Sequence, residues 1–447
     1  MFQVFRNAWM DTQLRKKILY TLFIIILFRL GSNIFVPFLN NDAIQTMTSG
    51  ASLLNYLDVM TGGSLGKGTL LAMSITPYIN ASIIIQLLAV AIPPLEKLQK
   101  EGEQGRKKLN TITKITSLAI AVLQAISFYI MLRNGTTVDN QHVAVLKYGD
   151  VNQVNPDMFS VVLSAIVIVA CFVAGASMII WLGDRINEKG IGNGISMILF
   201  AGIISGLPSA VQYFVTIVRD EPANIGFVLL ALVIFIAMVW FVIMMTNAER
   251  RIPVQYAKRV VGRKMYGGQS SHIPIKVAMS GVMPIIFAQS IASLPATICM
   301  LFGVTSESGG FWGGFLKVFN TSSWLYAIIY LLLIVFFAYF YSTIQFNTVE
   351  VANNLKNNGG FIPGIRPGRP TSEYLNKVLN KVTMFGALYL SIIAVTPIII
   401  SICSTSAANS GVYLGGTSII IVVSVALETV RALEAQMIMR NYKGFLD

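Results

Sequence analysis

Residues 61–68 read TGGSLGKG, a glycine-rich stretch with a lysine that could surround a phosphate group. The phosphate-binding loop has the spacing G-x-x-x-x-G-K-[ST], in which backbone N–H groups and the lysine contact the phosphates. With Gly66 and Lys67 as its anchor, this pattern needs Gly at position 61 and Ser or Thr at position 68. The sequence has Thr61 and Gly68 there instead. The stretch therefore does not predict a nucleotide site, and its glycines need another explanation.

The rest of the sequence offers no familiar catalytic or metal-binding motif. HExxH and CxxC do not occur, and outside residues 61–68 neither does G-x-S-x-G. His142 and His272 fall in loops that we expect on opposite sides of a membrane, so they cannot share a metal ion. Cys171, Cys299 and Cys403 lie in or beside apolar runs without paired spacing, which is typical of small packing residues. We therefore expect no enzyme, no cofactor and no metal site.

The elements that position these residues are predicted to be membrane-spanning helices. The chain has 447 residues, of which 55% are hydrophobic and 12% charged, whereas a soluble domain is about 25% charged. One span needs about 20 apolar residues, and continuous apolar runs favour helices over the alternating strands of a barrel. The sequence predicts an all-α integral membrane protein with ten spans, at about 18–36, 69–92, 115–133, 158–182, 194–217, 223–246, 278–302, 323–345, 382–403 and 413–434.

The distribution of basic residues predicts the orientation in the membrane. An even number of spans places both termini on one side, and Lys and Arg mark the cytoplasmic side. Most of the 33 Lys and Arg residues fall in the two termini and in alternate loops. The loops of the opposite side hold only Lys67, Arg133, Lys147, Arg219 and Lys317. We therefore expect both termini in the cytoplasm and the glycine-rich stretch outside, away from cytoplasmic ATP.

Few charged residues fall within the predicted spans. Arg29 lies in the first span and Glu428 near the end of the last. Each is expected to face the bundle, paired or hydrated, because a charge in lipid is costly. Ion-coupled transporters usually carry carboxylates near the middle of the membrane. The near-absence of such residues argues against a secondary transporter of a small solute, which stays as the alternative, beside a scaffold subunit without a pore.

Two glycine-rich breaks interrupt the apolar pattern. The sequence LLNYLDVM before residues 61–68 is short and amphipathic. It predicts either a segment that enters the bundle from outside and ends in a hinge, or an ordinary external loop with a surface helix. Gly190, Gly192 and Gly194 precede the fifth span and predict a tight cytoplasmic turn.

Two cytoplasmic loops, at about 247–277 and 347–381, exceed the length of about 12–15 residues beyond which a loop is usually functional or disordered. The second has prolines and glycines around Arg366 and Arg369, which predict a stiff protruding tip rather than a helix. Such cations suit an anionic partner, namely RNA, an acidic protein or lipid headgroups. Alternatively, they only orient the spans.

Five stretches spread from the second span to the last carry a resemblance to a known family. They are SITPYINASIIIQLL (74–88), GIGNGISMILFAGIISGLP (190–208), RRIPVQYAKR (250–259), NNGGFIPGIRPG (357–368) and LGGTSIIIVV (414–423). With its ten spans, the chain resembles the SecY family, the central subunits of bacterial protein-translocation channels, over essentially its whole length. The resemblance implies two pseudo-symmetric five-helix halves, 1–206 and 207–447, that form a clamshell around an hourglass pore.

The resemblance also implies a function and a set of partners. The chain would pass unfolded secretory polypeptides across the bacterial plasma membrane and release apolar segments sideways into the lipid. It would have no active site, and the SecA motor, protein synthesis on the ribosome or the proton-motive force would drive it. SecE and SecG would be its companion subunits, and signal sequences, nascent polypeptides and membrane lipids would contact it.

Site residues follow from the resemblance by matching positions. A pore ring is expected at Ile75, Ile79, Ile195, Leu199, Ile286 and Ile421, where Leu199 replaces the more usual Ile. An external plug at about 55–68 is expected to end in a hinge, with Leu57, Thr61, Gly62, Gly63, Ser64 and Gly66. The lateral gate is expected at Asn80, Gln86, Gln289 and Ser290, and docking of the motor or ribosome at Arg259, Arg263, Lys264 and Arg366. From the residues alone, each ring position reads as a packing or lipid-facing residue. Each gate position reads as a polar side chain that forms hydrogen bonds between helices.

Overall fold

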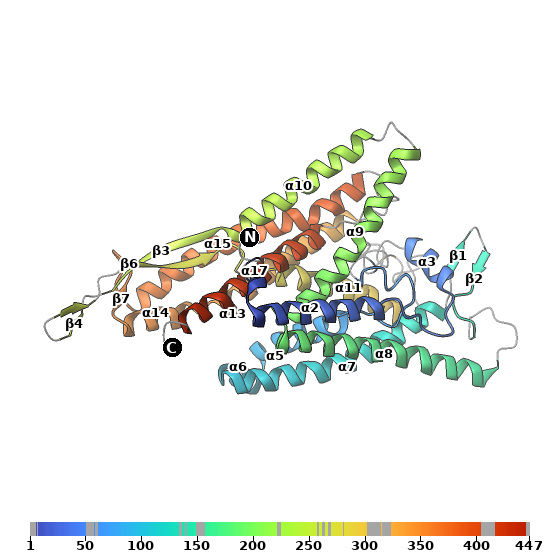
Figure 1. Cartoon of the computed structure of the whole chain (residues 1–447), viewed down its shortest axis with the longest axis horizontal. Helices are drawn as coiled ribbons and strands as arrows, with labels where there is room; N and C mark the ends of the chain where they lie inside the picture. The colour runs from blue at the N-terminus through green and yellow to red at the C-terminus, as the bar shows by residue number, and fades with distance from the viewer. Residues whose placement is uncertain are drawn as a thin grey trace.

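The chain forms an elongated bundle whose long helices run mostly along one axis (Figure 1). The computed structural model describes residues 6, 8–50, 58, 61–133, 136–138, 141–148, 157–220, 225–256, 259–261, 264–266, 270–279, 281–301, 314, 323–403 and 416–443. Within these residues one helix corresponds to each of the ten predicted spans. They are α2 (Thr12–Gly31), α5 (Thr76–Ala91), α7 (Glu103–Arg133), α8 (Met158–Lys189), α9 (Gly194–Asp220), α10 (Ile225–Asn247), α11 (Met283–Leu301), α13 (Trp324–Gln345), α15 (Arg369–Cys403) and α17 (Gly416–Lys443).

Shorter elements occupy the ends of the bundle. The short helices are α3 (Asn41–Gly50), α6 (Pro93–Lys100) and α14 (Thr348–Asn357). The strands are β1 (Thr136–Val138), β2 (Gln141–Val143), β3 (Glu249–Tyr256), β4 (Arg259–Val261), β5 (Lys264–Tyr266), β6 (Ser270–Lys276) and β7 (Gly360–Phe361). They pair antiparallel as β1–β2, as β6–β3–β7 and as β4–β5.

Several of the long helices meet the length and hydropathy that a bilayer requires. Among the described residues, five helices could each cross a membrane alone, and a sixth span results if α5 and α6, bent by 106° at Pro93, count as one. Charged residues in α2 and α17 lower their hydropathy, and α9 and α11 are apolar up to Pro208 and Pro295. The chain is thus a multi-pass membrane protein.

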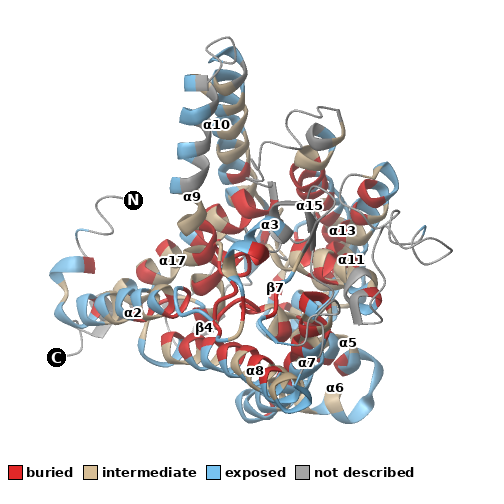
Figure 2. Ribbon diagram, turned by 90° about the vertical axis from the view of Figure 1, so that its right-hand side faces the viewer, coloured by how far each residue is buried: buried red, intermediate tan, exposed pale blue. Residues whose placement is uncertain are grey.

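The outer surface of the bundle is apolar where lipid would contact it. Figure 2 shows buried residues where the helices meet and exposed residues along the outer faces of helices such as α10. On α10, Leu229, Ile236 and Trp240 are each more than half exposed. A soluble protein rarely exposes an apolar face of this size, whereas hydrocarbon chains cover it without cost.

The observed start of α5 differs from the predicted second span, which began at residue 69. Helix α5 begins at Thr76 with Pro77 in its first turn, a position that suits proline because it needs no N–H donor there. Residues 69–75 form turns instead, and Ser74 has a positive φ of 49° that a helix does not allow. Residues 69–75, at the start of the predicted span, are therefore non-helical.

Neighbouring helices in the sequence mostly pack against each other. Helix α5 packs on α7, α7 on α8 and α8 on α9, while α11 packs on α13 and α13 on α15. Helix α11 also contacts α5 and α7, and α17 contacts α9, so the earlier and later spans meet along these pairs. The half boundary proposed at 206/207 falls inside the continuous helix α9.

The long loops at 247–277 and 347–381 are folded. The prediction of a tip rather than a helix around Arg366 and Arg369 is wrong for Arg369, because α15 begins at that residue. The strands β3 and β6 form a hairpin, and β7 adds to β3 by pairing Gln255 with Phe361. Ile252 and Val254 alternate inward along β3 and join Leu355 of α14 and Leu375 of α15 in a small apolar core. We call β3, β6, β7, α14 and the first turns of α15 the loop platform.

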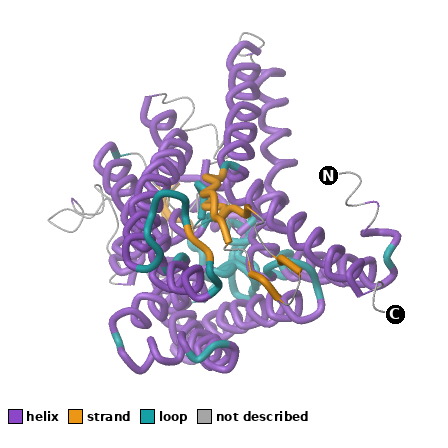
Figure 3. Tube along the Cα trace, turned by 90° about the vertical axis from the view of Figure 1, so that its left-hand side faces the viewer, coloured by secondary structure: helices purple, strands orange, loops and turns teal. Residues whose placement is uncertain are grey.

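The loop platform lies at one end of the molecule, and α3, β1 and β2 lie at the other (Figure 1). Figure 3, viewed from the platform end, shows orange strands in front of the purple helices of the bundle. This separation agrees with the predicted topology, in which the loop that holds β1 and β2 and the two long basic loops are on opposite sides of the membrane.

Candidate functional site

The residues predicted to form the pore ring meet in one apolar cluster. They are Ile75 and Ile79 at the start of α5, Ile195 and Leu199 in the first turns of α9, Ile286 on α11 and Ile421 on α17. Ile75, Ile421 and Leu199 are 1%, 3% and 9% exposed, and the other three are half-buried. The ring positions thus lie together although hundreds of residues separate them in the sequence.

Side chains from two further helices, α2 and α8, pack into this cluster. Phe28 of α2 and Leu182 of α8 belong to it and are almost fully buried. The six ring positions are all aliphatic, so they offer neither a hydrogen-bond partner nor a charge to an ion. A constriction of this kind stops ions by excluding water, and it does not select among polypeptide sequences.

The glycine-rich stretch is packed into the molecule and does not form a surface loop. Turns occupy residues 62–68, and Thr61 and Ser64 are 5% and 1% exposed. The Asp58 carboxylate accepts a hydrogen bond from the Gly66 N–H over 2.6 Å, and the Thr61 hydroxyl accepts one from the Leu65 N–H. Leu57, the remaining predicted residue, lies outside the described residues. Residues 61–68 are therefore packed among the helices, whereas residues 53–60 before them lie outside the described residues apart from Asp58.

Gly62 is required by its backbone conformation and by its neighbours. Its φ of 69° lies in the left-handed region, which side chains with a Cβ rarely adopt. A Cβ at this position would lie 2.6 Å from the carbonyl oxygen of Gly202 on α9, which is closer than atoms pack. Gly63 also has a positive φ, of 80°, but open space around it. Close packing explains Gly62, and conformational freedom explains Gly63.

Burial raises the pKa of Asp58 above its ordinary value of 3.8. The hydrogen bonds from Gly66 and Leu65 and the charge of Lys67 act in the opposite direction but do not outweigh burial. The carboxyl group therefore favours its neutral form more in this position than it would in water.

The predicted lateral-gate residues lie where α5 and α7 meet α11. Asn80 and Ser290 are 7% and 8% exposed, and Gln289 is half-buried. Gln86 donates to the Ser82 hydroxyl over 3.0 Å on its own helix. Helix α11 packs against both α5 and α7, so the helices that carry the predicted gate residues are in contact.

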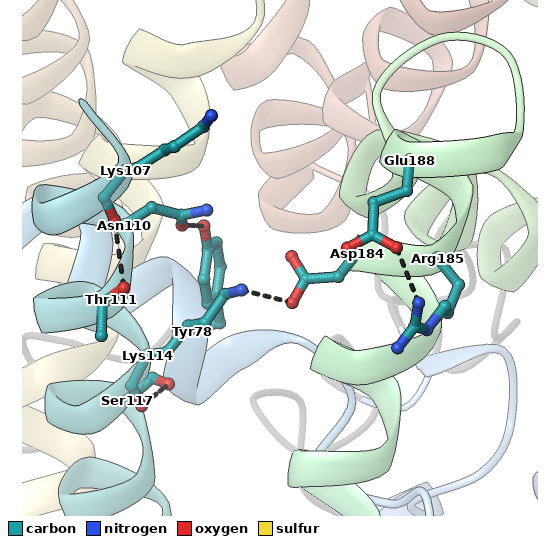
Figure 4. Close-up of polar contacts among 9 residues, drawn as sticks. All are labelled: Tyr78, Lys107, Asn110, Thr111, Lys114, Ser117, Asp184, Arg185 and Glu188. Atoms are coloured by element: carbon teal, nitrogen blue, oxygen red, sulfur yellow. Dashed lines mark hydrogen bonds and ion pairs between the residues drawn. The ribbon is translucent and has the colours of Figure 1, made fainter. Parts of the chain in front are cut away.

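A polar cluster beside this seam was not predicted from the sequence (Figure 4). The Tyr78 hydroxyl donates to Asn110 over 3.3 Å and joins α5 to α7. Lys114 of α7 and Asp184 of α8 form an ion pair. Lys114 lies before the third predicted span and Asp184 after the fourth, so each was assigned to a loop, although both belong to helices that extend beyond the apolar runs.

The predicted docking residues lie on or beside the loop platform. Arg366 is exposed, and its carbonyl accepts a hydrogen bond from the Thr371 hydroxyl at the start of α15. Arg259 and Lys264 are in the hairpin of β4 and β5, which extends beyond β3 and β6 in Figure 1. Arg263 lies outside the described residues. Pairing of β3 with β7 holds the two loops together, so their cations belong to one end of the molecule.

The charged residues expected inside the spans differ in their surroundings. Arg29, at the end of α2, is half-buried and donates to the carbonyl of Gly62. Glu428 is exposed on α17, which fits the hydrated alternative.

Comparison with known proteins gives consistent matches over the chain. The SecY family matches residues 69–430. The chain is 41% identical over 454 residues to "Protein translocase subunit SecY" of Streptomyces coelicolor, covering 100% of both chains. It is 39% identical over 461 residues to the protein of that name from Thermotoga maritima, covering 100% of this chain and 98% of the other.

Solved structures share the fold at low sequence identity. "The structure of a protein conducting channel" superposes with a TM-score of 0.64 at 16% identity, over 96% of this chain and 93% of that one. "Sec61 in the Canine ribosome-channel complex from the endoplasmic reticulum" superposes with a TM-score of 0.61 at 15% identity, over the same shares of 96% and 93%.

Proposed function

Because the chain belongs to the SecY family, we propose that it forms the protein-conducting channel of a translocase. Unfolded secretory polypeptides cross the membrane through it, and apolar segments leave sideways into the lipid. The chain has no catalytic step of its own, and energy comes from a motor or from protein synthesis. The observation that carries this proposal is the meeting of all six ring positions in one apolar cluster.

The ring suits a channel that must pass many sequences and leak few ions. Aliphatic side chains exclude water when nothing occupies the constriction, and they adapt to a passing polypeptide without recognising it. Half of the ring residues are nearly inaccessible to solvent, which supports a constriction that is closed when no polypeptide occupies it. The segment at about 55–68 acts as the plug on the external side.

The lateral gate is the seam between α5, α7 and α11. Hydrogen bonds between polar side chains within a membrane contribute about 1 kcal/mol each, so an apolar signal sequence can replace them. Asn80, Gln86, Gln289 and Ser290 are the gate residues in this proposal. The two halves, 1–206 and 207–447, move apart on either side of this seam.

The loop platform binds the cytoplasmic partners. Arg366 is the main contact, and Arg259, Arg263 and Lys264 add positive charge. The partners are the SecA motor and the ribosome, and a solved relative with the same fold is described as a ribosome-channel complex. SecE and SecG complete the complex in the bacterial plasma membrane, with both termini of the chain in the cytoplasm.

Crosslinking tests whether a substrate passes through the ring. The three native cysteines are replaced, one cysteine is placed at Ile79 or Ile286, and a secretory chain with a single cysteine is stalled during translocation. A crosslink that depends on SecA and on the signal sequence supports the proposal. If SecA and SecE bind normally and no crosslink forms at either position, the substrate does not pass this ring.

A further inference from the structure

Arg29 contacts the segment that the proposed function treats as the plug. Its Nη1 lies 3.1 Å from the carbonyl oxygen of Gly62 and 3.4 Å from the hydroxyl of Ser32. The side chain thus reaches from the last turn of α2 to a residue 33 positions along the chain. A hydrogen bond from a charged donor is stronger than one between neutral groups.

Helix α9 lies against the other side of Gly62. The Ser205 hydroxyl lies 3.4 Å from the Gly62 carbonyl oxygen, but its single hydrogen is donated to the Gly202 carbonyl over 2.7 Å. Because Gly62 also packs directly against Gly202, the segment is seated between α2 and α9 at this one residue.

The chain beyond Gly62 is fixed by different contacts. The Val36 N–H donates to the Gly68 carbonyl over 3.1 Å, and the Leu70 N–H donates to the Ile34 carbonyl over 2.8 Å. Phe35 and Thr69 form a bridge between these bonds. Backbone pairing therefore anchors residues 68–70, whereas the Arg29 side chain and packing against α9 hold Gly62. Loss of the contact at Gly62 would leave the backbone anchor at residues 68–70 in place.

The position of Arg29 also allows the contact to be reversible. The side chain comes from the last turn of α2, where the helix dipole favours a cation. The Ser32 hydroxyl offers a further acceptor close by. When Gly62 moves away, the guanidinium keeps favourable partners, so release does not leave an unpaired charge.

We propose that Arg29 is a positioning residue that latches the plug in its closed position through the carbonyl of Gly62. This inference rests on the proposed function, because it takes residues 55–68 as the plug. Arg29 holds the segment upstream of its backbone anchor and so sets how readily the idle channel opens.

The test measures ion leak through the idle channel. The chain is reconstituted with its companion subunits in lipid vesicles, without motor or substrate, as wild type, Arg29→Gln, Arg29→Lys and Arg133→Gln. Arg133 is the matched control, since it lies in the last turn of α7, is exposed and loses the same charge. We expect Arg29→Gln to raise the leak about tenfold to a hundredfold, as loss of one charged hydrogen bond predicts. Arg29→Lys is expected to leak less than Arg29→Gln, and Arg133→Gln to stay tight.

A second comparison separates the latch from damage to the fold and from failure of the plug assignment. Deletion of residues 57–67 is combined with Arg29→Gln. If Arg29 acts through the plug, the substitution adds no leak to the deleted channel. Two results would overturn the latch but not the plug assignment. In the first, Arg29→Gln raises the ion leak equally in the full-length and the deleted channel. In the second, the deleted channel leaks but the full-length Arg29→Gln channel does not. A deletion that does not leak overturns the plug assignment itself.

Discussion

Lys114 of α7 and Asp184 of α8 form an ion pair, with 2.6 Å between Nζ and Oδ2 (Figure 4). Tyr78 extends the connection to α5 through Asn110 on α7. Three consecutive long helices are thus joined by polar contacts beside the seam that we propose as the lateral gate. These contacts favour movement of α5, α7 and α8 as one unit when α11 moves away.

The ion pair is expected to contribute modestly to stability. The side chains are 38% and 25% exposed, so solvent screens the attraction. Asp184→Lys should lower stability by about 1 kcal/mol, and the exchanged pair Lys114→Asp with Asp184→Lys should restore most of it. Thermal unfolding of the purified complex measures this. Exchange of the exposed pair Glu103 and Lys107 is the control and should change nothing. Failure of the exchanged pair to recover would contradict a direct interaction.

The apolar ring predicts that a single polar side chain increases ion leak. Ile286→Asn places a hydrogen-bonding group in the ring, lets water enter and should raise the conductance of idle channels at least tenfold. Ile286→Leu keeps the volume and the apolar character and should stay tight. Conductance in planar bilayers distinguishes the two. Equal conductance of both variants and wild type would show that the barrier lies elsewhere.

The burial of Asp58 leads us to expect that external pH changes the stability of the closed position of the proposed plug. Its pKa is raised above 3.8 by burial, so the seated segment prefers the neutral carboxyl. The resulting stabilisation is complete below the ordinary pKa and is lost as pH rises through the raised pKa. Lowering the external pH from about 7 to about 4 should therefore reduce the idle leak.

The variant Asp58→Asn checks this pH dependence. Asparagine does not titrate but keeps an oxygen that can accept from the Gly66 N–H. The ion leak of the Asp58→Asn channel should be the same at both pH values. It should be close to the leak of the wild-type channel at the lower pH. A wild-type leak that increases on acidification would reverse the sign that burial predicts.

We expect substitution of Arg366 to impair motor-driven transport without preventing assembly with SecE. Arg366→Glu reverses an exposed charge on the loop platform and should lower SecA-dependent translocation at least tenfold, because like charges across an interface are strongly unfavourable. Lys377→Glu, an exposed reversal further along α15, is the matched control. Translocation of a secretory precursor into vesicles is measured, with SecE co-purification as the check on assembly. Normal translocation by the Arg366 variant would remove Arg366 from the docking site.

Much of the fold could be predicted from the sequence, because every backbone N–H and C=O group of a span must be hydrogen-bonded within the lipid and a helix achieves this. Each predicted apolar run contains a helix in the described residues, and the continuous hydropathy of α10 or α13 leaves no other choice. Helix ends were less accurate, because α7 and α8 continue past their apolar runs into charged sequence. The start of α5 was missed because hydropathy does not register the turns before Pro77.

The loop platform was missed although its signal was present. Ile252 and Val254 are separated by Pro253, and Ile273 and Ile275 by Pro274, so apolar side chains recur every second residue. This period of two is typical of strands with one buried face. The contact between Arg29 and Gly62 had no such signal, because a contact from a side chain to a distant carbonyl leaves no pattern in the sequence. The ring positions came from the family resemblance, since many other Ile and Leu residues have the same local pattern.

The folded state of the loop platform also bears on how force travels through the molecule. The Val277 N–H donates to the Ala248 carbonyl over 2.9 Å and closes the base of the hairpin, directly between the end of α10 and the residues that lead into α11. The platform has its own apolar core, and only residues 277–282 separate β6 from α11. A displacement of the platform would therefore reach α11 through a short stretch of backbone.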